Sequence, residues 1–89
     1  MWSGYRFRIL TAQGGAAPGG QKSYLEGGRM TRGFALVAYP AMYGATGIMT
    51  FIVGPDGQIF QTDLGEQTDA VAGAMTAYDP DSSWKRVAS

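Results

Sequence analysis

The 89-residue chain contains no histidine and no cysteine. Without them it cannot form a Ser-His-Asp triad, a Cys-His pair, a disulfide framework or a zinc site of the usual ligands. A domain of this size buries only about 60–65% of the surface of its unfolded chain, so its stability is marginal. Because no disulfide is available, packing or self-association must supply that stability.

Long hydrophobic runs are also missing. Residues 34–42 form one of the longest, which is far shorter than a membrane span of about 20 residues and is interrupted by Pro40. Residues 1–5 lack the pattern of charge, apolar stretch and small-residue cleavage site that is typical of a signal peptide. We therefore expect no membrane insertion by this chain, and we find no targeting signal in it.

The charged side chains balance overall but are divided between the two halves of the chain. Residues 1–45 carry five basic residues and one acidic residue, whereas residues 46–89 carry two basic and six acidic residues. The two halves can neutralise each other within one fold, or a basic and an acidic face can meet between subunits. No cluster of lysine and arginine is interleaved with aromatic residues, so the sequence does not indicate nucleic-acid binding.

An alternating segment near the N-terminus predicts a strand. In residues 5–10, large apolar side chains alternate with arginine, which is the period of a half-buried strand. We expect the apolar set to face the core and the arginines to face solvent. The apolar set is Tyr5, Phe7 and Ile9, and the basic set is Arg6 and Arg8.

Three further segments predict the rest of an antiparallel sheet. Residues 33–39 are apolar on both faces, which places them in the middle of the sheet, and Pro40 ends them. Residues 48–53 and 58–63 flank a Gly-Pro-Asp-Gly turn and predict a β-hairpin. Residues 22–25 are compatible with a short strand.

The C-terminal third predicts a helix over residues 66–78. Acidic residues occupy its first turns, where the helix dipole favours them, and Thr68 is an alternative start. Asp79-Pro80 ends it, because the residue before proline avoids helical angles. The apolar residues at helical spacing are Val71, Ala74, Met75 and Tyr78.

These elements predict one α+β domain spanning residues 1–89. It consists of a small antiparallel sheet of about four to five strands, with one C-terminal helix packed on one face. We expect Trp84, in the tail after the helix, to return to the core. An alternative is that the chain is a piece of a longer exported protein.

From Gly4 to Val87 the sequence resembles the C-terminal part of a group of bacterial proteins, the domain-of-unknown-function family 2950. The resemblance implies export to the bacterial envelope, and therefore a periplasmic or envelope location, but no known activity or catalytic residue. Members are longer and begin with an export signal. The matching segments are YRFRILTAQG from Tyr5, APGG from Ala17, GFALVAYP from Gly33, GIMTFIV from Gly47 and YDPDSSWK from Tyr78.

A weaker likeness is to the soluble sheet of bacterial pilins and pseudopilins. It consists of an aromatic strand, an aromatic-Pro loop and a hairpin with an Asp-Gly turn, in similar order. Pilins polymerise through a long apolar N-terminal helix, which this sequence does not contain.

Two segments could be mistaken for ligand sites. The loop QGGAAPGG, residues 13–20, lacks the Gly-Lys-Ser/Thr sequence and following helix of a phosphate-binding loop, so we interpret it as a surface loop. Asp79, Asp81, Ser82 and Ser83 offer oxygen ligands without the spacing of a calcium-binding loop, and a helix stop followed by a turn explains them. We expect no metal and no cofactor.

Carboxylates around the hairpin provide one catalytic alternative. Asp56 belongs to the turn and Glu66 to the start of the helix, whereas Asp63 has the weakest structural explanation. Asp63 and Glu66 could act as acid and base in a small hydrolase whose cleft forms at a subunit interface. A Ser-Lys pair at Lys22 and Ser23 is disfavoured, because neighbours on a strand point to opposite faces.

The residues around Pro40 provide the binding hypothesis. If they are exposed together, they form an amphipathic patch for a partner or a sugar, although closing the core at the sheet edge is the more ordinary explanation of these residues. We therefore predict a non-enzymatic interaction module of the cell envelope that binds another copy of itself or another envelope protein. Edge strands of so small a sheet also favour pairing. The contact residues we predict are Tyr39, Met42, Tyr43, Arg6 and Arg8.

Overall fold

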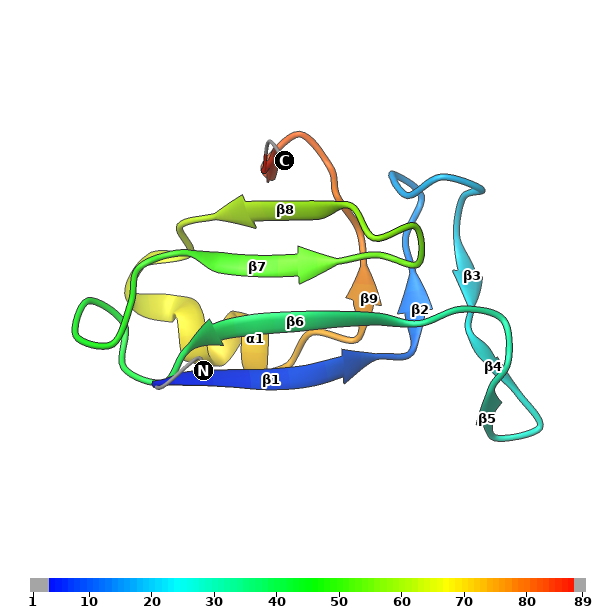
Figure 1. Ribbon diagram of the computed structural model, residues 1–89, viewed down its shortest axis with the longest axis horizontal. Coiled ribbons are helices and arrows are strands. Elements are labelled where there is room, and N and C mark those ends of the chain that lie inside the picture. Colours follow the sequence, from blue (N-terminus) through cyan, green and yellow to red (C-terminus); the bar gives the residue numbers. More distant parts are fainter. Residues whose placement is uncertain (1–3, 88–89) are drawn as a thin grey trace.

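The computed structural model describes residues 4–87, and their main body is a five-stranded antiparallel sheet (Figure 1). The strand order is β1-β6-β7-β8-β10, so β1 and the very short β10 lie at the two edges. The expected α+β class and antiparallel sheet are therefore observed. The strands are β1 (Tyr5–Leu10), β6 (Ala35–Pro40), β7 (Thr50–Val53), β8 (Ile59–Thr62) and β10 (Lys85–Arg86).

The two central strands are the apolar segments that the sequence places there. β6 lies between β1 and β7, with Val37 opposite Arg8 on one side and opposite Ile52 on the other. β7 and β8 form the predicted hairpin, and the amide of Gly57 closes its turn by donating to the carbonyl of Gly54 at 3.0 Å. The expectations for this part of the sheet are confirmed.

The helical segment is shorter than predicted. A 3₁₀ turn, η1 (Gly65–Gln67), leads into α1 (Thr68–Gly73), which packs against β6 on the far side of the sheet in Figure 1. The predicted extension to Tyr78 is wrong, and Val71, expected on the buried face, is 44% exposed. The alternative start at Thr68 is where α1 begins.

Tertiary pairing explains why the helix stops early. After Gly73 the chain extends into β9 (Ala77–Tyr78), which pairs in parallel with β2 (Ala12–Gln13), and β2 pairs with β3 (Lys22–Ser23) on its other side. In this position the Tyr78 side chain is completely buried, with its ring centre 6.3 Å from that of Phe60. Burial of a large aromatic residue outweighs the weak helix propensity of the segment.

The core lies between the main sheet, α1 and the small β2-β3-β9 sheet. Trp84 packs against it from the tail, as predicted. The fully or nearly fully buried apolar residues of this core are Leu10, Ala17, Tyr24, Ala35, Val37, Tyr39, Ile52, Ala72 and Tyr78.

A short hairpin extends from the body beyond β3 (Figure 1). Its strands are β4 (Leu25–Glu26) and β5 (Arg29–Met30), so the predicted strand over residues 22–25 is divided between β3 and β4. An exposed ion pair, with 3.0 Å between Arg32 Nη2 and Glu26 Oε2, links β4 to the segment that follows β5. An ion pair so exposed contributes little stability.

The orientation of β1 is the reverse of the prediction. Phe7 and Ile9 are each 55% exposed, whereas Leu10 is completely buried and Arg8 points to the helix side of the sheet. The alternating pattern identified the strand correctly but assigned the wrong face to the core, because both faces of this sheet are apolar at β6 and β7.

Candidate functional site

The sheet face opposite α1 is apolar and exposed. No described element crosses it, and the shallow groove on it has a volume of about 310 Å³. Ile9 and Ile59 are among its exposed side chains, the latter 39% exposed. We call this surface the open face. The residues that line its groove are Phe7, Leu36, Ala38, Phe51, Val53, Ile59 and Val87.

The strand register explains how the open face forms. Residues directly opposite each other in an antiparallel sheet point to the same side. One row across the sheet therefore joins Ile9, Leu36, Val53 and Ile59. The next row joins Phe7, Ala38, Phe51, Gln61 and Lys85. From β1 to β8 these two rows contain no charged side chain.

The three arginines of the sheet lie on the other side. Arg8 is opposite Val37, and Arg86 is opposite Phe60, which pairs in turn with Ile52. These cross-strand pairs place Arg8 and Arg86 on the face of the sheet that α1 covers. The open face thus carries little charge, and its groove is lined only by apolar side chains.

Arg8 has a structural role in the described fold. Its Nη1 donates to the carbonyls of Ala72 and Met75, at 3.3 and 2.6 Å. These carbonyls lie at and just after the C-terminal end of α1, where the helix dipole favours a cation and the last carbonyls lack helical partners. This contact joins the basic and acidic halves of the sequence within one chain.

We expect Arg8→Ala to lower the free energy of unfolding by about 1–3 kcal/mol, because two carbonyls lose a charged donor. Arg6→Ala is the matched control: it removes an exposed arginine from the same side of β1, and its effect should stay within about 0.5 kcal/mol. Urea unfolding followed by circular dichroism measures both. Equal losses of unfolding free energy in the two variants would show that the contact between Arg8 and α1 does not stabilise the fold.

The five residues predicted to bind a partner do not form one surface. Tyr39 is only 5% exposed and belongs to the core, and Arg8 contacts α1. Arg6 is exposed on β1, and Met42 is 63% exposed in the loop after β6. Tyr43, in the same loop, is half-buried.

The proposed acid–base residues have structural contacts. Asp63 is exposed, and its Oδ1 accepts hydrogen bonds from the Tyr43 hydroxyl at 2.7 Å and from the Gly65 amide at 2.8 Å. The hydrogen bond to Asp63 raises the pKa of the Tyr43 phenol, with further contributions from burial and from the charges of Asp63 and Glu66. Asp63 thus starts the η1 turn and anchors the Tyr43 loop, and Glu66 is exposed in η1.

The glycine-rich loop, residues 13–20, is held in place by Gln13, for which the sequence analysis predicted no role. Gln13 is buried, and its amide nitrogen donates to the carbonyls of Pro18 and Gly20 at 2.8 and 2.7 Å. Its amide oxygen accepts from the buried Tyr24 hydroxyl. No helix follows this loop; β3 does, so it does not provide the phosphate-binding geometry of a helix N-terminus.

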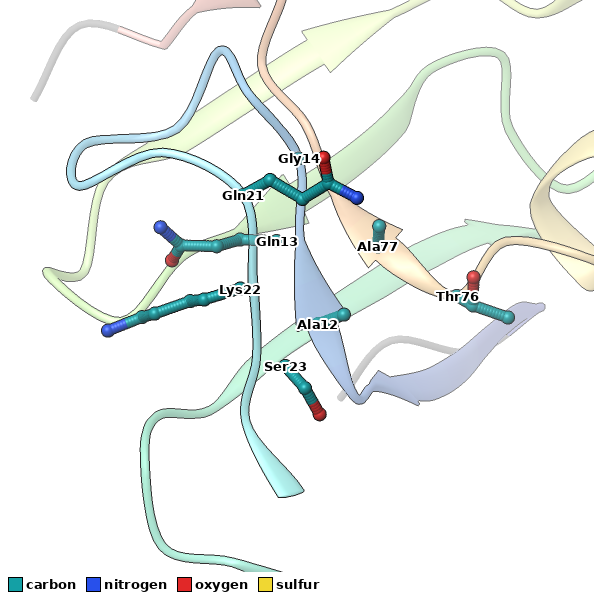
Figure 2. Close-up of a pocket in the computed structure, with 8 residues that line it drawn as sticks. All are labelled: Ala12, Gln13, Gly14, Gln21, Lys22, Ser23, Thr76 and Ala77. Atoms are coloured by element: carbon teal, nitrogen blue, oxygen red, sulfur yellow. The ribbon is translucent and has the colours of Figure 1, made fainter. Parts of the chain in front are cut away.

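A second hollow, of mixed polar and apolar lining, lies over the small sheet (Figure 2). Ala12 and Ala77 form part of its floor, and Gln21 extends over Gly14 at one end. The side chains of Gln13 and Lys22 point away from the hollow, on the other side of the strands. With a volume of about 570 Å³ and no aromatic platform, it presents backbone, hydroxyl and amide groups but no acid or base in position for catalysis.

The residues weighed as calcium ligands also have structural contacts. Asp79 Oδ1 accepts from the Ala16 amide at 2.9 Å, and Asp81 Oδ1 accepts from the amide and hydroxyl of Ser83. The Ser83 hydroxyl, together with its amide, lowers the pKa of Asp81. Among residues 4–87, no group of three or more acidic side chains is placed to hold a metal ion.

A family model described as Protein of unknown function (DUF2950) matches residues 1–87, which is nearly the whole chain. The chain belongs to this family. No curated protein and no solved structure matches the DUF2950 chain, so these comparisons do not show the expected likeness to pilins. In the described part of this DUF2950 protein, no helix has the length and hydropathy needed to cross a membrane.

Proposed function

We propose that this DUF2950 chain is a non-enzymatic interaction module of the bacterial cell envelope that associates with another copy of itself. The observation that carries the proposal is the open face. A sheet with apolar residues on both sides is stable when both sides are covered, and here α1 covers one of them. Exposed apolar patches of this kind mark interaction sites.

The contacts of the candidate catalytic residues support an interaction role over a hydrolytic one. Asp63 is exposed and engaged by Tyr43 and Gly65, and Glu66 is exposed on a 3₁₀ turn. A general acid or base acts from a cleft that holds the substrate within hydrogen-bond reach, and these two carboxylates are exposed on the surface.

Light scattering after size-exclusion chromatography tests the proposal. We expect the mean mass of the wild type to rise with concentration, and Ile59→Glu to reduce this rise at least tenfold in apparent association constant, because it places a charge in the apolar surface. Ala70→Glu, which places the same charge on the exposed side of α1, is the control and should associate within about threefold of the wild type. A wild type that stays monomeric up to millimolar concentration would refute self-association.

A further inference from the structure

We infer that two copies of this chain pack open face against open face, as the two sheets of a β-sandwich, and that apolar contact rather than charge holds them together. The inference rests on the proposed function and names the surface and the geometry that would serve it. Two antiparallel sheets pack in this way about 10 Å apart, with their strands roughly aligned.

The chemistry of the open face selects a partner surface that is itself a sheet of apolar residues. Between β1 and β8 its two rows carry Ile, Leu, Val, Phe, Ala and one Gln, and no charge. A charged or strongly polar partner would lose hydration without gaining a hydrogen-bonding group in return. A second copy presents the same chemistry and the same extent.

The shape of the face is also compatible with a copy of itself. Ala38 is only 4% exposed and lies between the larger Phe7 and Phe51 in one row, so it is a recessed position, whereas Ile9 and Ile59 are exposed at the ends of the other row. A two-fold interface has to be complementary to itself, so each patch must hold both projecting and recessed positions. The open face has both.

The area of the open face indicates which size class the interface between two copies would belong to. Strands about 4.8 Å apart, with a rise of about 3.3 Å per residue, give a face of roughly 400 Å² in plan, or about 800 Å² for two copies. A standard stable interface buries about 1,600 Å² in total, and weak, reversible ones bury less than about 1,200 Å². The dimer should therefore be in rapid, concentration-dependent equilibrium with the monomer.

Pairing along the sheet edge is disfavoured by the arginines of β1. A second β1 strand beside the first would bring Arg6 and Arg8 close to the same residues of the copy, and like charges on neighbouring strands destabilise the pairing. Charges that point inward from an edge strand are a known device against such pairing. The other edge, β10, has only two residues.

The absence of cysteine allows a direct test by single-cysteine variants. Ile59→Cys and Leu36→Cys place a thiol on the open face, and Ala70→Cys places one on the exposed side of α1 as the matched control. We expect the rate of reaction with Ellman's reagent to fall at least fivefold for the two face thiols between low micromolar and millimolar protein. The control rate should change by less than a factor of two.

The salt dependence is measured on the same samples. An apolar dimer keeps or strengthens its association in 1 M NaCl, whereas a contact between opposed charges weakens as the Debye length shortens to about 3 Å. Association that weakens with salt would overturn the apolar mode.

The outcomes separate this inference from the proposed function. If light scattering shows a dimer but all three thiols react equally at every concentration, the copies associate through another surface, so the packing mode is wrong and self-association stands. If the face thiols are protected even at low micromolar protein, another part of the same chain or a bound apolar molecule covers the face, and the inference fails. If no dimer forms, the proposed self-association fails as well.

Discussion

Replacing Ile52 by alanine should lower the free energy of unfolding by about 2–5 kcal/mol, whereas the same replacement at Ile59 should lower it by about 1 kcal/mol or less. The two residues lie on the adjacent strands β7 and β8 but on opposite faces of the sheet. Ile52 is completely buried in the core on the side of the sheet that faces α1, and Ile59 is on the open face. Loss of the Ile52 side chain leaves a cavity in the core. The Ile59 side chain is already partly in contact with water, so its loss removes fewer packing contacts.

Urea unfolding at low micromolar protein, where the monomer dominates, measures this difference. A domain of this length has a total stability of roughly 4–13 kcal/mol, so Ile52→Ala can remove a large share of it. At millimolar protein the cost of Ile59→Ala should increase, because association stabilises the folded wild type by mass action. Equal costs for both substitutions in the monomer would mean that the open face is packed within a single chain.

Replacing Gly33 by alanine should destabilise the fold by about 2–5 kcal/mol, through two effects that act together. Its φ of 152° lies in a region that residues with a Cβ rarely adopt, and the added Cβ would lie 2.6 Å from Cδ1 of the buried Tyr24 ring. Displacement of this ring would also break the hydrogen bond from the Tyr24 hydroxyl to Gln13, which holds the glycine-rich loop.

Gly28→Ala separates the two effects. Gly28 has a φ of 82°, but an added Cβ would meet no atom within 4 Å, so only the backbone cost of about 1–2 kcal/mol remains. Thermal unfolding followed by circular dichroism measures both variants. In a domain of this size 1 kcal/mol shifts the Tm by about 4–8 °C, so the Gly33 variant should melt at least about 8 °C below the wild type. Equal Tm values for the two variants would rule out the clash with Tyr24.

Much of the sheet could be predicted because its signals are local. The Gly-Pro-Asp-Gly turn between two β-branched and aromatic segments specifies the β7–β8 hairpin, and a strand apolar on both faces has to lie between neighbours, as β6 does. The helix was predicted too long because its end is decided by contacts with residues that are distant in the sequence. Residues 74–78 have a helical pattern, but β9 pairs with β2, more than sixty positions away, and Tyr78 is buried against Phe60 of another strand.

The candidate site could be predicted only in part. Except for Val87 in the tail, the apolar residues of the open-face groove were predicted to lie on strands. Their exposure depends on how much surface α1 covers, and the short helix covers one side. The predicted patch around Pro40 was divided because Tyr39 and Tyr43 lie on segments with different directions. Tyr39 turns into the core, and the Tyr43 hydroxyl reaches Asp63.

The sequence by itself determined the four longer strands β1, β6, β7 and β8, the tight turn and the absence of histidine and thiol chemistry, because these follow from residue type and short-range spacing. The tertiary structure decided which face of β1 is inside. An alternating strand is ambiguous when the sheet is apolar on both sides, and the contact that favours one orientation is between Arg8 and carbonyls of α1 that lie 64 and 67 residues away. That contact turns Phe7 and Ile9 outward and creates the open face on which the proposed function depends.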